Sequence, residues 1–305
     1  MPAAESLIVV PAAAAGERLD GFLQRYGEEP DRSRTEWQRM IAVQSVLLNG
    51  LPSKPGQRVA ANDHITIAVI PSRLELPPED EVPFTVVFED PAIIVVSKPA
   101  GVVVHPAPGN ERGTLVNGLL ARYPELRSED EFRPGIVHRL DKDTSGLMVV
   151  GRTLSAMSNL QRQWRQGSVE KRYLMLVRGA IAEDEGFIDK PIGRDPRHRQ
   201  RMAVRREGRT AQTHFWVRER FAGWTYLEAQ LLTGRTHQLR VHFASIGHQI
   251  AGDATYGRDA QLAGLNRQFL HAYLLRLRSP ADAREHVFTA ELPEDLSTVL
   301  QRLRR

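Results

Sequence analysis

The first 70 residues place apolar side chains at both helical and alternating intervals. A helix is predicted over Arg18–Tyr26, because its apolar residues recur every three or four positions. A second helix should follow, with Trp37 and Ile41 on its apolar face. Leu7–Val10 is typical of a short first strand, and Val46–Leu48 of a strand that leads into an Asn-Gly turn.

From Phe84 onward, short strand patterns outnumber helical ones, and the mixture predicts one large α+β domain. Helices are predicted over Leu115–Ala121, Leu154–Gln166 and Arg235–Ile246. Strands are predicted over Thr85–Phe88, Ile93–Val96, Leu147–Val150, Tyr173–Val177, Gln212–Val217 and Tyr226–Leu231.

A linker is predicted over Pro71–Pro83, because the sequence PSRLELPPEDEVP is rich in proline and acid and has few apolar residues. We therefore expect four parts. They are an N-terminal strand and extension over 1–16, a small α+β domain over 17–75, a linker over 76–83, and a large domain over 84–305.

Composition limits the class of protein. The chain has 305 residues and no cysteine, which excludes disulfides, zinc–thiolate sites and a thiol nucleophile. No apolar run approaches the ~20 residues of a membrane helix, and the N-terminus lacks the positive region of a signal peptide. We expect a cytoplasmic protein without a membrane partner, and nothing in the sequence requires more than a monomer.

Positive charge is concentrated in one segment, although the net charge is only +4. Lys190–Arg209 holds eight basic side chains and only two acidic ones, and it shows no sustained helical or strand period. We interpret it as a basic loop. Such a density of like charges is typical of contact with a polyanion, so Arg197, Arg199 and Arg201 are candidate nucleic-acid contacts.

Residues 135–152, GIVHRLDKDTSGLMVVGR, place two carboxylates on a turn between apolar stretches. Asp141, Asp143 and Ser145 copy the start of a calcium-binding EF-hand loop, but position twelve is Arg152 where a glutamate is needed. The Asp141-x-Asp143 spacing also fits an aspartyl-phosphate enzyme, but the residues before it are polar rather than those of a buried strand.

A third interpretation comes from five ordered strings of sequence. HRLDKDTSGL at 138–147 resembles the signature of RluA-type pseudouridine synthases, and KPAGVVVHP at 98–106 resembles their first motif. Lys171-Arg172-Tyr173, TGRTHQLRVH at 233–242 and GDATYG at 252–257 resemble further elements of that family. Residues of about 17–70 resemble the S4 RNA-binding module. The S4-like module with HRLDKDTSGLMVV is most similar to members that modify large-subunit ribosomal RNA.

The resemblance implies a small S4-like domain followed by a larger, mainly antiparallel catalytic domain. It implies an isomerase that cleaves the uracil N1–C1′ bond and rejoins the base through C5, with no redox cofactor, nucleotide or metal. Asp141 would be the essential carboxylate, acting on C1′, on the uracil ring or on the C2′ proton. Arg240 would pair with it, and Tyr173 would lie against the target base. Arg139 would fill the space left by the extruded base.

Further positions are assigned to RNA. Lys98 and Arg235 are expected at the rim of the cleft. His138 is assigned to the substrate pocket, although a structural hydrogen-bonding role is the commoner one for such a histidine. On the S4-like module, the candidate contacts are Arg32, Arg34, Arg39 and Lys54. The rival hypothesis is a catalytically idle RNA-binding or ribosome-assembly factor. The combination of Asp141, Tyr173 and Arg240 argues against it, because a protein that only binds RNA needs none of the three.

Overall fold

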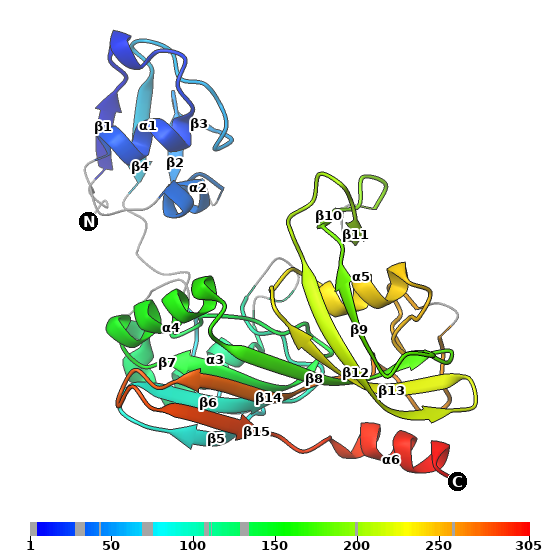
Figure 1. Cartoon of the computed structure of the whole chain (residues 1–305). Helices are drawn as coiled ribbons and strands as arrows, with labels where there is room; N and C mark the ends of the chain where they lie inside the picture. The colour runs from blue at the N-terminus through cyan, green and yellow to red at the C-terminus, as the bar shows by residue number, and fades with distance from the viewer. Residues whose placement is uncertain are drawn as a thin grey trace. The chain divides into compact units, whose positions relative to one another are not determined.

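The computed structural model describes residues 5–27, 34–42, 44–68, 76–106, 110, 112–128, 134–198, 201–257 and 260–305. The chain divides into two compact units, Met1–Glu75 and Leu76–Arg305. Each unit has its own helices and strands (Figure 1) and a hydrophobic core of its own. Within the described ranges, no helix is both long and apolar enough to span a bilayer.

The first unit combines two helices with a four-stranded antiparallel sheet in the order β1-β4-β2-β3. The helices are α1 (Leu19–Tyr26) and α2 (Arg34–Ala42), and a 3-10 turn, η1, spans Ala12–Ala14. The strands are β1 (Glu5–Val9), β2 (Val46–Leu48), β3 (Leu51–Pro52) and β4 (His64–Ala68).

The predicted helices and hairpin of this unit are confirmed. Apolar residues of both helices, among them Phe22 and Trp37, are buried in one core with Ile65 of β4. Asn49 and Gly50 have φ angles of 53° and 74°, as a tight turn between β2 and β3 requires. The short first strand is confirmed as β1, and it belongs to the sheet of this unit, because it pairs with β4 along its whole length.

The second unit is built on a nine-stranded sheet in the order β5-β6-β7-β14-β8-β13-β12-β9, with β15 also paired to β14. All pairs are antiparallel except β7 with β14. The strands are β5 (Thr85–Glu89), β6 (Ile93–Lys98), β7 (Ser145–Gly151), β8 (Glu170–Arg178), β9 (Glu185–Asp189), β12 (Gln212–Phe221), β13 (Trp224–Leu231), β14 (Leu270–Arg278) and β15 (Glu285–Thr289).

Helices cover both faces of this sheet. On one face, α3 (Leu115–Arg122) and α5 (Gln238–Ser245) share a core with alternate residues of β6, β7, β8 and β13. On the other face, α4 (Leu154–Gln166) packs on β6 and β7, and α6 (Glu294–Leu303) packs on β8 and β13. A short 3-10 helix, η2 (Pro124–Ser128), follows α3.

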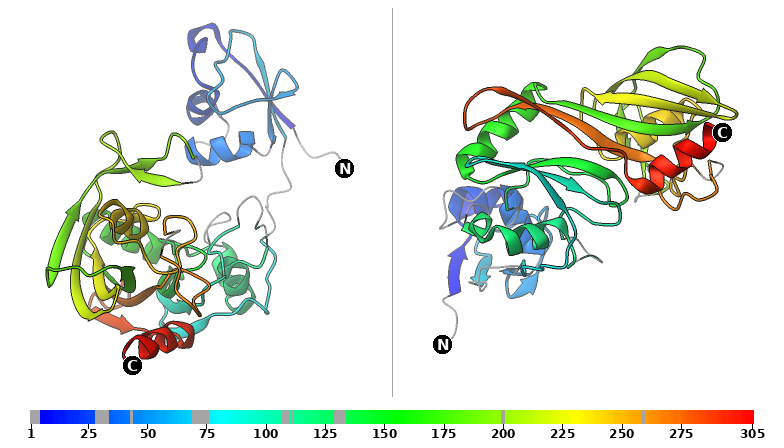
Figure 2. Two further views of the ribbon diagram at one scale, coloured as in Figure 1. Left: turned by 90° about the vertical axis from the view of Figure 1, so that its right-hand side faces the viewer. Right: turned by 90° about the horizontal axis from the view of Figure 1, so that it is seen from below.

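Three expectations about this unit need correction. The basic segment is not an irregular loop: β10 (Ile192–Arg194) and β11 (Met202–Val204) pair as an antiparallel hairpin that projects beyond the sheet (Figure 2). The helix expected from Arg235 begins only at Gln238, because the preceding residues form a turn. Each of these strands has only three residues, which is too short a run to show an alternating pattern in the sequence.

The third correction concerns the linker. Leu76 and Val82 are buried in the core of the second unit, with 7% and 8% of their surface exposed. The side-chain amide of Asn117 in α3 donates to the Pro77 carbonyl at 2.9 Å. The backbone carbonyl of Asn117 accepts the Glu79 N–H at 3.1 Å. Residues 76–83 therefore belong to the second unit, and the expected sparsity of core residues there was wrong.

Candidate active site

Asp141 lies on the loop that leads into β7, and hydrogen bonds to backbone carbonyls hold this loop in place. Its carbonyl accepts the Thr144 N–H at 3.1 Å, and Arg267 donates to the Asp143 carbonyl at 3.1 Å. The Asp141 side chain is 21% exposed. Residues 138–141 do not form a strand.

Lys98 also helps to hold the Asp141 loop, and it is not the surface contact that we expected. It is fully buried, and its ammonium donates to three backbone carbonyls, those of Pro99, Val102 and Lys142, at 2.7, 2.8 and 2.9 Å. Burial lowers the pKa of Lys98 to about 7, although the nearby Asp143 charge opposes the shift. The side chain ties the end of β6 to the residue beside Asp141, so it cannot contact RNA at a cleft rim.

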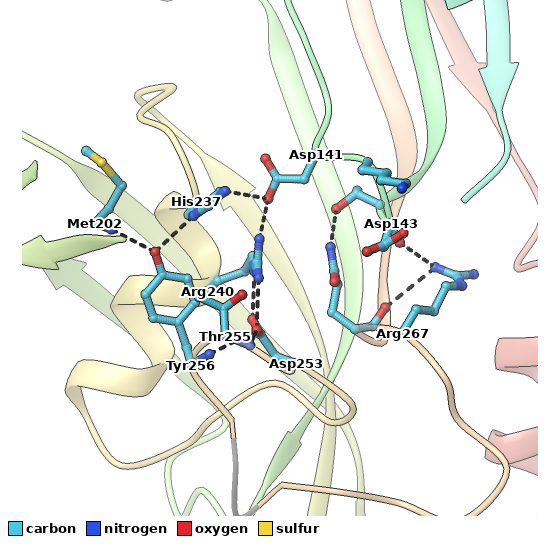
Figure 3. A network of polar contacts seen from close by, with 12 residues as sticks. Asp141, Asp143, Met202, His237, Arg240, Asp253, Thr255, Tyr256 and Arg267 are labelled. Atoms are coloured by element: carbon cyan, nitrogen blue, oxygen red, sulfur yellow. Dashed lines mark hydrogen bonds and ion pairs between the residues drawn. The ribbon is translucent and has the colours of Figure 1, made fainter. Parts of the chain in front are cut away.

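A chain of three charges runs from Asp141 into the protein (Figure 3). Arg240 of α5 donates to Asp141 Oδ2 at 3.1 Å and to both carboxylate oxygens of Asp253 at 2.7 and 2.9 Å. Asp253 is fully buried, and its Oδ1 also accepts two backbone N–H groups. The expected pairing of Arg240 with Asp141 is confirmed, and two parallel hydrogen bonds to Asp253 fix the guanidinium plane.

These contacts shift the pKa values of Arg240 and Asp253 in opposite directions. Burial lowers the pKa of Arg240, but its bonds to Asp253 and Asp141 outweigh burial and hold that pKa above its usual value. Burial raises the pKa of Asp253, but the bonds from Arg240 outweigh it and hold that pKa below its usual value. Both groups are therefore charged at neutral pH.

His237 and Tyr256 form a second branch around Asp141. His237 Nε2 lies 3.8 Å from Asp141 Oδ2, and its Nδ1 lies 2.9 Å from the Tyr256 hydroxyl. The same hydroxyl accepts the Met202 N–H of β11 at 2.8 Å. The Tyr256 ring has the Arg240 and Arg201 guanidinium groups 5.1 and 5.0 Å from its centre. One tyrosine thus joins the basic hairpin to the residues around the carboxylate.

Tyr173 lies on β8, between β13 and β14, and its neighbours in register are Ala229 and Ala272. These small residues leave the tyrosine ring room in the pocket. The side chain is buried, and burial, followed by the Asp141 charge, raises the pKa of its hydroxyl well above the usual value. The hydroxyl is therefore protonated at neutral pH.

A pocket of about 260 Å³ brings the predicted catalytic residues together. It lies below the range of roughly 300–1,000 Å³ that is typical for drug-sized ligands, so it suits one flat ring. Residues on its wall include Asp141, Tyr173, Arg240, Arg139, Lys171 and Arg235.

His138 and Trp164 form one wall of this pocket. His138 Nε2 accepts the Val149 N–H at 3.0 Å, and its ring stacks on Trp164 with centres 4.5 Å apart. Burial lowers the pKa of His138 to about 3, so the ring is neutral. The structural role noted for this histidine is present, and its Nε2 is not available to a substrate.

The other predicted RNA contacts are spread over both units. Arg139 is exposed beside the pocket, and Arg235 donates Nε to the Thr210 carbonyl at 2.9 Å. Arg197 and Lys54 are exposed, whereas Arg34 is bound to buried Asp20 at 3.1 Å. Arg32 and Arg199, and the side chain of Arg39, lie outside the described residues.

Sequence reasoning did not assign Asp253, Tyr256, His237 or Lys171 to the site. Asp253 and Tyr256 both lie in the string GDATYG, so the signal was present but no chemistry followed from it. The EF-hand interpretation fails, because the residues after the loop form β7 and not a helix. In the part of the chain that the structure describes, no three potential metal-binding side chains cluster together.

Comparison with known proteins gives the site a family. The sequence profile of the family described as RNA pseudouridylate synthase matches residues 92–245. An uncharacterized RNA pseudouridine synthase of Chloroflexus aurantiacus is 48% identical, covering 99% of this chain and 95% of that protein. The ribosomal large subunit pseudouridine synthase D of Xanthomonas campestris is 43% identical, over 97% and 92%.

A solved structure agrees with this assignment. Human RNA pseudouridylate synthase domain containing 4 superposes with a TM-score of 0.58 at 25% identity, covering 72% of this chain and 93% of that one. The matched region of the sequence includes Asp141, Tyr173 and Arg240, the three residues that meet in the pocket. The chain therefore belongs to the RNA pseudouridylate synthase family.

Proposed function

We propose that this protein isomerises uridine to pseudouridine in large-subunit ribosomal RNA, and that the reaction depends on the Asp141 carboxylate. The observation that supports the chemistry is the Asp141–Arg240 pair at a pocket that also contains Tyr173. The target is supported by relatives named ribosomal large subunit pseudouridine synthase D, which are 41–43% identical over nearly the whole chain. We place this activity in the cytoplasm.

The reaction breaks the N1–C1′ bond, turns the base and joins C5 to C1′. Asp141 acts at one of three points: it attacks C1′, attacks the uracil ring, or removes the C2′ proton. Arg240 holds the carboxylate toward the pocket, and Asp253 holds Arg240. Because the donors are fixed before substrate arrives, little reorganisation is needed during the reaction.

Tyr173 can serve the uracil in two ways. Its ring offers a flat face for stacking, and its hydroxyl can take part in a proton transfer. Its ring is held in a strand and flanked by alanines, so it presents a rigid surface on which uracil can stack. We infer that its hydroxyl, or a water bound to it, assists removal of the C5 proton.

The target uridine has to leave its stack before it can enter the pocket, at a cost of a few kcal/mol. Arg139 is exposed at the pocket and has a planar guanidinium that can stack in the vacated space and offset part of that cost. The basic hairpin β10–β11 would bind the surrounding phosphates. The first unit would bind RNA as an S4-like module, through Lys54 among its exposed cations.

Tritium release tests this function. Large-subunit rRNA transcribed with tritium on uracil C5 loses the label when C5 joins the sugar, so we expect release by the wild type and none by Asp141→Asn. Asp184→Asn, which removes a carboxylate that is 88% exposed, should behave as the wild type. Release by Asp141→Asn at the wild-type rate would contradict the assigned carboxylate. No release by the wild type from naked rRNA or subunit particles would contradict the proposed function.

A further inference from the structure

Lys171 places an amine in the pocket to which the chemistry above gives no role. It precedes Tyr173 by two residues on β8, and alternate residues of a strand point to the same face of the sheet. Both side chains line the pocket, and Lys171 Nζ lies 5.8 Å from the centre of the Trp164 ring. Lys171 is half-buried, so its charge is only partly hydrated.

Four cationic side chains line this pocket, and three are accounted for. Arg240 is bound to Asp141 and Asp253. Arg235 donates to a backbone carbonyl, and Arg139 is exposed to water at the surface. Among the described residues, no carboxylate forms an ion pair with Lys171. Burial lowers the pKa of its amine, which indicates that the charged form lacks a compensating partner.

We propose that Lys171 is a further catalytic residue, whose ammonium group stabilises the uracil as an anion after its bond to C1′ breaks. This role rests on the proposed function. When the N1–C1′ bond breaks, its electron pair stays on N1, and the negative charge spreads to the O2 and O4 carbonyls. The ammonium donates to one of these oxygens. The pair of the new C5–C1′ bond then comes from the ring, C5 loses its proton, and N1 gains one.

The position of Lys171 favours the base over the phosphates as its partner. It lies beside Tyr173, against which the base is proposed to stack, on the aromatic wall formed by Trp164 and His138. The exposed cations of the β10–β11 hairpin, Arg197 among them, are better placed for the backbone of the RNA. A cation in a poorly hydrated pocket stabilises a developing anion far more than one in water.

Single-turnover kinetics test this role. Tritium release and RNA affinity would be measured for the wild type, Lys171→Met, Lys171→Gln and Lys171→Arg. Arg284→Met is the matched control, because it removes an exposed charge from the turn between β14 and β15. We expect Lys171→Met to slow the bound-state rate about 10²–10³-fold with RNA affinity unchanged. Lys171→Gln should be similarly slow, and Lys171→Arg should recover part of the rate.

A second experiment uses a uracil that leaves C1′ more easily. Its result distinguishes a catalytic role of Lys171 from a purely structural one. Fluorine at C5 makes uracil more acidic, so its anion needs less help from the protein. The defect of Lys171→Met should therefore shrink on RNA containing 5-fluorouridine, measured as loss of that nucleoside after nuclease digestion. An unchanged bound-state rate, a defect equal for both bases, or a defect confined to RNA affinity would overturn the role. An inactive wild type would instead defeat the proposed function itself.

Discussion

At the residue scale, the arrangement around Asp141 depends on a buried charge that touches no substrate. Asp253 fixes the guanidinium of Arg240 with two hydrogen bonds, and Arg240 in turn contacts Asp141. If the inner carboxylate is neutralised, Arg240 stays buried but loses one of its two anionic partners. The position of the Asp141 carboxylate therefore depends on the charge of Asp253.

We expect Asp253→Asn to destabilise the protein by about 3 kcal/mol and to slow tritium release by about 10²-fold. Because the pKa of Asp253 is depressed, its stabilisation is present above the unfolded-state value and is lost as pH falls through the lower folded-state value. The stability gap between variant and wild type should thus be constant near neutrality and narrow in strong acid. Denaturant unfolding at several pH values measures it.

The control for this variant is Asp184→Asn, which removes one partner of an exposed ion pair with Arg220. Its stability should change by less than about 1 kcal/mol. If Asp253→Asn matched that control in both unfolding and tritium release, the inner carboxylate would have no part in holding Arg240.

At this scale, the sequence predicted a contact where both residues lie in recognisable motifs, and it failed where the contact forms only through folding. The pairing of Asp141 with Arg240 was predicted because each lies in a recognisable string of the family. The burial of Lys98 was not predicted, because its three carbonyl acceptors converge only after folding, and one of them lies 44 residues away. A lysine beside a turn is exposed in most sequences, so the pattern favoured the wrong interpretation.

At the element scale, the turn end of the basic hairpin β10–β11 contacts the residues around Asp141 and also exposes a cation to solvent. Met202 and Arg201 contact Tyr256, while Arg197 at the turn is exposed. The charge of the segment predicted contact with a polyanion, but it did not reveal the two strands, because each has only three residues. Strands β14 and β15 were missed as well, and β14 is central to the sheet.

We expect Arg197→Gln to weaken rRNA binding and to reduce the slope of log affinity against log salt concentration by about 1, because one phosphate contact is lost. The melting temperature and the rate of tritium release from bound RNA should be unchanged. Arg284→Gln removes an exposed charge at the turn between β14 and β15 and serves as the control. Filter binding across a salt series makes the measurement. Equal slopes for both variants and the wild type would remove the hairpin turn from the RNA contact surface.

At the scale of the whole molecule, the boundary between the units decides which residues stabilise the catalytic fold. The proline-rich, acidic composition predicted a linker up to residue 83, yet part of that segment fills the core of the second unit. Composition describes only the average of a segment. Here two apolar side chains among acidic ones, Leu76 and Val82, pack in the core of the second unit. The cores of the two units share no residue, so we expect the second unit to fold alone.

Two fragments of the chain test this boundary, one beginning at Leu76 and the other at Phe84, both ending at Arg305. The shorter fragment loses the buried side chains of Leu76 and Val82, and with them the hydrogen bonds between Asn117 and residues 77–79. Each buried aliphatic side chain contributes about 1.5–3 kcal/mol, so we expect the shorter fragment to be less stable by about 3–5 kcal/mol. Chemical denaturation of both fragments makes the comparison. Equal stabilities would return residues 76–83 to the linker and leave the core of the catalytic unit complete without them.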